Sequence, residues 1–130
     1  MPWMQEKQLF EYAVIRVVPR VDREEFLNVG VILYCPKLKF LELVYTLDAA
    51  RLLAMDAKLD VEELEAHLRA FGEITRGGPG GGPIGQLDLA GRFRWLTATR
   101  STILQTSKVH PGFCSEPAVA LERLHTALVL

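Results

Sequence analysis

The stretch that decides the fold is residues 10–47, FEYAVIRVVPRVDREEFLNVGVILYCPKLKFLELVYTL. Three runs in it are rich in β-branched and aromatic side chains, a composition typical of β-strands. They cover residues 10–19, 28–36 and 39–47. Because only a Pro-Lys-Leu-Lys turn joins the second run to the third, we predict that these two strands form an antiparallel hairpin.

The first of these strands is apolar on both sides, since side chains alternate between the two faces of a strand. One face carries Ala13, Ile15 and Val17, and the other carries Tyr12, Val14 and Val18. A strand of this kind lies in the interior of a sheet that is covered on both sides. Arg16 is the one charged exception on the second face, and Pro19 is expected to end the strand.

Helical signals follow from residue 48 onward. Asp48 is a predicted N-cap for a short helix over residues 49–55, and Asp60 is a predicted N-cap for a longer one. The longer helix has an apolar stripe of Val61, Leu64, Leu68 and Phe71. Gly72 is expected to weaken or end this helix, because glycine is a poor helix former.

The second half of the chain predicts two more helices and one more strand. A short helix is expected within residues 86–96, and a fourth strand over residues 101–106. Residues 108–115 form a turn-rich stretch that we predict to be a loop. A helix runs from Glu116 to the end, with Pro117 tolerated in its first turn.

One segment has low sequence complexity. Residues 76–85, RGGPGGGPIG, contain six glycines and two prolines, which predicts a flexible loop. A phosphate-binding P-loop would need a Gly-Lys-Ser/Thr sequence between a strand and a helix, and this segment has neither the sequence nor the flanks. Neither the segment before this loop nor the segment after it makes a complete domain by itself, so we do not treat the loop as a domain boundary.

Length and composition fit a single α+β domain over residues 1–130. We predict an antiparallel sheet of about four strands with helices packed against it. The formal net charge is -1, from 15 basic and 16 acidic residues. Because phosphate neutralisation supplies most of the affinity for nucleic acids, the missing basic excess argues against nucleic-acid binding.

The chain reads as a cytoplasmic protein. Its apolar runs are far shorter than the roughly 20 residues of a membrane helix, and the N-terminus has no hydrophobic signal region. Cys35 and Cys114 show no C-x-x-C spacing and are expected to be reduced thiols. The three scattered histidines predict no metal site.

The charged connection after the first strand is the first candidate binding site. It carries Arg20, Arg23 and Glu25, with Asn28 at the start of the next strand. Arginine offers a fork of donors that matches a carboxylate or a phosphate. The alternative is a solvated turn in which Asn28 bonds the local backbone.

A second candidate cluster begins within the short helix and contains Arg94, Arg100 and Ser101. Basic residues interleaved with Trp95 and several threonines are suited to a phosphorylated ligand or to a single-stranded base. The alternative is an ordinary helix surface whose Phe93 and Trp95 fill the core. If the fourth strand pairs with the first, the two candidate clusters share one end of the sheet.

His110 precedes Pro111-Gly112 and is the histidine that can face a cleft. Cys114 or Ser101 as a nucleophile with His110 matches no known nucleophile context, so we do not favour this arrangement.

Three stretches resemble a known family. Residues 12–35, YAVIRVVPRVDREEFLNVGVILYC, are similar to the opening of the bacterial domain of unknown function DUF3037. Residues 93–112, FRWLTATRSTILQTSKVHPG, resemble its second distinctive block, and residues 116–129 its closing helix. The resemblance implies no catalytic residues and no cofactor. It implies a partner or accessory role, because genes of this family often lie beside one for a HipA-like kinase.

These observations lead to a functional hypothesis. We predict a non-catalytic binding or accessory protein that acts on a protein partner, such as a HipA-like kinase, or on a small anionic ligand. The alternative is an enzyme with phosphate-directed hydrolytic chemistry that uses Glu24 or Glu25 together with His110.

Overall fold

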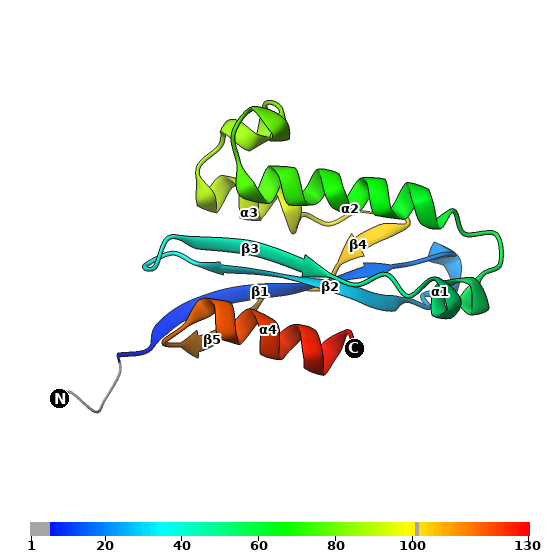
Figure 1. Ribbon diagram of the computed structural model, residues 1–130, viewed down its shortest axis with the longest axis horizontal. Coiled ribbons are helices and arrows are strands. Elements are labelled where there is room, and N and C mark those ends of the chain that lie inside the picture. The colour runs from blue at the N-terminus through cyan, green and yellow to red at the C-terminus, as the bar shows by residue number, and fades with distance from the viewer. Residues whose placement is uncertain (1–5, 101) are drawn as a thin grey trace.

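The structure, a computed structural model, describes residues 6–100 and 102–130 (Figure 1). Its strands are β1 (Gln8–Val17), β2 (Leu27–Cys35), β3 (Phe40–Tyr45), β4 (Leu104–Thr106) and β5 (His110–Cys114). Its helices are α1 (Ala49–Met55), α2 (Val61–Arg76), α3 (Leu89–Leu96) and α4 (Pro117–Leu128). Three single 3-10 turns complete it, at Val21–Arg23, Pro79–Gly81 and Ile84–Gln86.

The five strands form one antiparallel sheet with β1 in its interior. The order is β3-β2-β1-β4, and β5 also pairs with β1. On the side away from β2, β4 pairs with Ile15 to Val17 and β5 pairs with Gln8 to Tyr12. The two short strands therefore lie end to end along one edge of β1. Between them, Ser107 donates its backbone N–H to the carbonyl oxygen of Val14 at 2.8 Å.

Helices cover both faces of the sheet, so the molecule has three layers. Figure 1 shows α2 and α3 on one face and α4 on the other. The first layer packs on Ala13, Ile15 and Val17 of β1, all fully buried. The second core, under α4, includes the buried residues Phe10, Val31, Leu33, Cys35, Cys114 and Leu121. The single α+β domain and the two-sided burial of β1 are confirmed.

Most element boundaries follow the local chemistry of the sequence. The side chain of Asp48 accepts a hydrogen bond from the N–H of Arg51, and that of Asp60 accepts one from Glu63, so both predicted N-caps are confirmed. Glu116 is the N-cap residue of α4, and Pro117 occupies its first turn. The hairpin of β2 and β3 is antiparallel, with Val31 opposite Val44.

Three predictions about local structure need correction. The fourth strand is only Leu104–Thr106, and the stretch after it is not a loop but contains β5. Pro111 lies within β5 because an edge strand has no neighbour on its open side to which it must donate. Helix α2 does not end at Gly72 but continues to Arg76.

The glycine-rich segment folds back on itself after α2. Gly78 donates its N–H to the carbonyl oxygen of Gly85 at 3.0 Å, which closes the segment into a compact loop. Gly77, Gly78 and Gly82 have positive φ angles, which glycine adopts without steric cost. The flexibility of this loop stays a prediction.

Gly30 is required by the close approach of β2 and β3. A β-bulge interrupts the pairing of β1 with β2 between Ile15 and Arg16, and Gly30 lies beside it. A Cβ atom at Gly30 would be 2.8 Å from the carbonyl oxygen of Val44 and 2.9 Å from the Cβ of Tyr45. No side chain fits there without displacing β3.

Two glycine-to-alanine substitutions should therefore change stability in opposite directions. We expect Gly30→Ala to lower the free energy of unfolding by about 1–3 kcal/mol, because the added methyl overpacks the sheet. Gly72→Ala places its methyl 3.5 Å from the flexible Arg76 side chain and should stabilise α2 by about 0.5–1 kcal/mol. Urea denaturation measures both changes, and a loss of stability in Gly72→Ala would contradict the helix assignment.

Candidate functional site

The charged connection between β1 and β2 places its arginines in ion pairs. Arg20 contacts Asp22 at 3.2 Å, and Arg23 pairs with Glu25. All four side chains are more than half exposed. The hollow beside them, lined also by Asp56 and Lys58, has both signs of charge. The predicted residues come together here, but each arginine already has a carboxylate partner.

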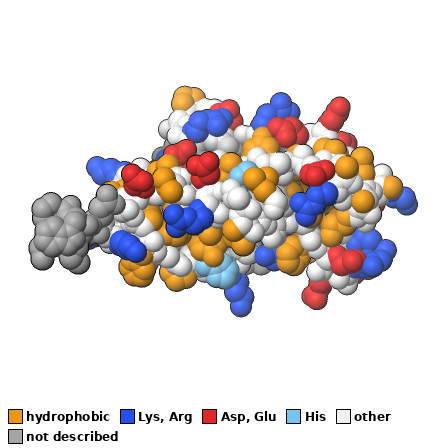
Figure 2. Space-filling model, turned by 60° about the horizontal axis from the view of Figure 1, so that its bottom comes forward, with side chains coloured by type: hydrophobic (Ala, Val, Ile, Leu, Met, Phe, Trp, Pro, Cys, Tyr) orange, Lys and Arg blue, Asp and Glu red, His pale blue; other side chains and the backbone are white. Residues whose placement is uncertain are grey.

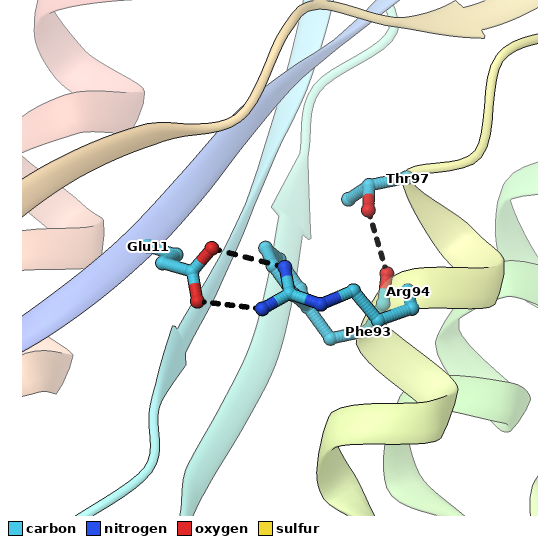
Figure 3. A network of polar contacts seen from close by, with 4 residues as sticks. All are labelled: Glu11, Phe93, Arg94 and Thr97. Carbon is cyan, nitrogen blue, oxygen red and sulfur yellow. Dashed lines mark hydrogen bonds and ion pairs between the residues drawn. The ribbon is translucent and has the colours of Figure 1, made fainter.

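Arg94 joins α3 to β1 instead of facing a ligand. Its two terminal nitrogens donate to the two carboxylate oxygens of Glu11, each at 2.9 Å, as Figure 3 shows. The hydrogen bonds to Glu11 raise the pKa of Arg94 above its ordinary value. The Thr97 hydroxyl donates to the carbonyl oxygen of Phe93 in the same helix. The two parallel hydrogen bonds between Arg94 and Glu11 fix α3 on the sheet.

Arg100 caps the C-terminal end of α3. Its guanidinium donates to the carbonyl oxygens of Trp95 at 2.7 Å, Leu96 at 2.9 Å and Ala98 at 3.2 Å. It also lies over the rings of Trp95 and Phe71, 4.6 and 5.4 Å from their centres. Burial lowers the pKa of Arg100, although an arginine remains charged at neutral pH. Carbonyl oxygens are neutral, so the positive charge of Arg100 is not cancelled.

Arg16 differs from these arginines because the described residues offer its guanidinium no carboxylate and no hydrogen-bond acceptor. Within residues 6–100 and 102–130, no carboxylate lies within ion-pair distance of it and no group accepts a hydrogen bond from its side chain. Its guanidinium carbon lies 3.9 Å from the centre of the Phe26 ring. Burial lowers the pKa of Arg16, because few contacts replace its hydration.

The neighbour of Arg16 on β2 also has an unmatched polar atom. Asn28 lies opposite Arg16 in the β1–β2 pairing, and its side-chain N–H donates to the carbonyl oxygen of Leu128 at 3.1 Å. Asn28 therefore fixes the end of α4. Its own side-chain oxygen and the Nε of Arg16 are both buried without a partner in the described chain. The Nε–H donor of Arg16 and the side-chain oxygen acceptor of Asn28 are thus left unmatched at opposite positions of β1 and β2.

Arg16 lines a hollow at the β4 edge of the sheet, which we call the Arg16 hollow. Its volume is about 490 Å3. Its lining is Arg16, Thr97, Thr99, Arg100, Gln105, Thr106, Ser107, Lys108 and Val109. Three of these side chains are cationic and five carry a hydroxyl or an amide, while no carboxylate is among them. Such a lining matches a small anion.

The two predicted clusters meet only in part. Strand β4 pairs with β1, and Val18 donates its N–H to the carbonyl oxygen of Ile103 at 2.6 Å, so both clusters do approach one end of the sheet. Arg20 and Arg100, however, line different hollows. Ser101 lies outside the described residues.

The residues of the hydrolytic alternative lie far apart. His110 is exposed, and its ring lies tilted against that of Tyr12, its partner in the β1–β5 pairing, with 5.4 Å between the ring centres. Glu25 precedes Leu27, which pairs with Val17. Tyr12 and Val17, the two β1 residues concerned, are five strand residues apart, or about 16 Å. The two side chains do not share a hollow.

Cys114 also lacks the environment of a nucleophile. It is buried, and burial together with the neighbouring Cys35 thiol raises the pKa of Cys114. His110 is four strand residues away on β5, or about 13 Å. A raised pKa lowers the thiolate fraction on which cysteine nucleophilicity depends.

Comparison with protein families identifies the chain. The model of the family described as "Protein of unknown function (DUF3037)" matches residues 12–129. The chain belongs to the DUF3037 family. Neither curated proteins nor solved structures provide a match to this DUF3037 chain. The description of the family assigns no activity, so the function of this chain has to be argued from the site.

Three further properties of the DUF3037 chain complete the description. Over the described ranges, no helix has both the length and the apolar character needed to cross a membrane. The same residues bring no three histidine, cysteine, aspartate or glutamate side chains together as a metal site would require. Figure 2 shows basic and acidic side chains interleaved on the face that carries α4, instead of one continuous basic surface.

The Arg16 hollow contains residues that sequence reasoning passed over. Arg100 belonged to a predicted cluster, but Lys108 and Gln105 did not, and Arg16 was noted only as an exception on an apolar strand face. A charged residue at an interior position of a buried strand was the available signal, because such charges are rarely buried without a partner.

Arg100 should contribute to stability, in contrast to Arg20. We expect Arg100→Met to lower the free energy of unfolding by about 1–3 kcal/mol, because it removes a charged donor from three helix-end carbonyls. Arg20→Met, which breaks an exposed ion pair, should change it by less than about 0.5 kcal/mol. Thermal and urea denaturation check both, and equal effects would contradict the capping role.

Both thiols should be protected from modification. Cys35 is fully buried and Cys114 is 8% exposed. We expect a thiol reagent at pH 7 to label the folded protein at least roughly 100-fold more slowly than the protein in guanidinium chloride, because labelling needs local opening. The absorbance of the coloured group that the reagent releases measures the rate of labelling. Rapid labelling of one cysteine in the folded state would show a reactive thiol.

Proposed function

We propose that this protein is a non-catalytic binding module that holds an anionic group in the Arg16 hollow. The observation that carries the proposal is that Arg16 has no ion-pair partner in the part of the chain that the structure describes. Arg20, Arg23 and Arg94 each have a carboxylate partner. Arg16, unlike these three, has no carboxylate partner within residues 6–100 and 102–130, and it lines a hollow together with Arg100, whose carbonyl partners leave its charge uncancelled.

Electrostatics favours an anion at this place. A partly buried cation has lost hydration, and an opposite charge nearby restores favourable interactions. Arg100 and Lys108 add two further positive charges to the lining. The Thr99 hydroxyl and the second N–H of the Gln105 amide are donors able to orient an oxyanion. A carboxylate or a phosphate matches this set of groups.

The anion has two possible sources. It is either a small molecule or a side chain of a protein partner, and the expected HipA-like kinase is one such partner. Arginine forks bind carboxylates and phosphates in the same way in both cases. The chemistry of the hollow is therefore the same, and an experiment must separate the sources.

The test measures anion binding by the full chain and by two variants. We expect phosphate and acetate, titrated by NMR, to shift the signals of residues around the hollow. Lys108→Gln, an exposed change that spares the fold, and Arg16→Gln should each weaken binding by roughly five- to tenfold, the loss expected for one charged hydrogen bond. Arg23→Gln, which removes an equal charge at the other hollow, is the matched control.

A second arm of this experiment separates the two sources. The wild-type chain and Lys108→Gln are used as baits in a lysate, and both small molecules and proteins are identified by mass spectrometry. A retained small anion supports a ligand, and a retained protein whose acidic or phosphorylated segment binds supports a partner. Unchanged binding of every anion in Lys108→Gln and Arg16→Gln would contradict the proposal.

A further inference from the structure

A second hollow lies next to the Arg16 hollow, and its lining is apolar. We call it the apolar groove. Its volume is about 500 Å3, and it lies between α2 and β4. It is lined by His67, Phe71, Arg100, Thr102, Ile103 and Leu104. No carboxylate is present among these lining residues.

The apolar groove exposes aliphatic surface that the fold does not use. Ile103 is 46% exposed, although Leu104 beside it is buried in the core. Phe71 of α2 is half-buried and forms the opposite wall. A concave apolar surface of this volume falls in the range of small-molecule sites, which are mainly apolar with a few fixed polar groups.

Arg100 connects the two hollows, because it lines both of them. Its guanidinium is held by three backbone carbonyls and by two aromatic rings. Leu104 of the groove and Gln105 of the Arg16 hollow are also consecutive residues of β4. A fixed positive charge therefore marks the boundary between a cationic and an apolar site, and a ligand needs no rearrangement of Arg100 to meet it.

We infer that the ligand is a small amphipathic carboxylate, whose anionic head lies in the Arg16 hollow and whose hydrocarbon part lies in the apolar groove. This inference rests on the proposed function, because it assumes that the hollow takes an anion. Charge complementarity decides the orientation. Arg16, Arg100 and Lys108 place three cationic side chains around the Arg16 hollow, whereas Phe71, Ile103 and Leu104 make the groove mainly apolar away from Arg100.

The test compares three probes that separate head from tail. Octanoate has both parts, acetate has only the carboxylate, and octanol has only the chain. Each is titrated into the full-length protein below the micelle concentration. A fully buried methylene improves affinity by roughly fourfold, so octanoate should bind at least about tenfold more tightly than acetate even in a half-open groove. Octanol should bind more weakly than octanoate.

Two matched variants locate the hydrocarbon part. Ile103→Asn replaces an exposed aliphatic side chain in the groove and should remove most of the difference between octanoate and acetate. Leu38→Asn makes a similar change in the turn between β2 and β3, where the side chain is 44% exposed, and should leave the difference intact. Lys108→Gln should weaken both carboxylates and leave octanol unaffected.

The outcomes show whether this inference fails alone or together with the proposed function. If acetate and phosphate bind in a Lys108-dependent way but octanoate binds no better, the anion site stands and the amphipathic ligand is overturned. If octanoate binds better but Ile103→Asn changes nothing, the hydrocarbon part lies elsewhere and the inference is also overturned. If no anion binds and octanol alone does, both proposals fail together.

Discussion

Burial of β1 on both faces is the constraint on which the rest of the structure depends. Ala13, Ile15 and Val17 pack under one helical layer, and Phe10 packs under the other. The strand pairs along both edges as well, and Phe10, the central residues Ala13 to Ile15, and Val17 are buried. Burial of this kind supplies the dominant favourable term in folding. The three layers follow, because each face of β1 needs its own cover.

The same constraint explains why Arg16 is unusual. A strand surrounded on all sides leaves little room for a charge, and a charge placed there must reach a partner, water or a ligand. Arg16 reaches the ring of Phe26 and the hollow at the β4 edge, where β1 is paired with only three residues. The shortness of β4 is what leaves the hollow open. Fold and candidate site are therefore two results of one arrangement.

The sequence predicted the elements whose signals are local. The caps at Asp48 and Asp60, the hairpin and the two-faced strand all depend on residues close together in the chain, and they were placed correctly. Strand β5 was missed because His110-Pro111-Gly112 has the composition of a turn. Its pairing with β1 depends on partners about 100 residues away, such as Tyr12 opposite His110, and no local pattern reports such a pairing.

The candidate site was less accessible to prediction for a related reason. Sequence identified arginines in polar stretches, but it is the carboxylates near them in space that decide whether they are available. Glu11 neutralises Arg94 across 83 residues of chain, and no spacing rule predicts that pair. Arg16 was noted only as a charged exception in an apolar run and was not weighed as a binding residue. The arrangement in space, not the local composition, decides which cations are left without a partner.

Pro111 has a consequence for how the molecule behaves at high concentration. An open sheet edge invites a strand from another molecule, and such pairing is the first step towards fibrils. Strand β5 is the outer strand at this edge and has only five residues, one of which has no N–H to offer. An incoming strand cannot form a continuous ladder across it. Pro111, which gave the sequence of β5 the composition of a turn, thus also protects this strand edge against aggregation.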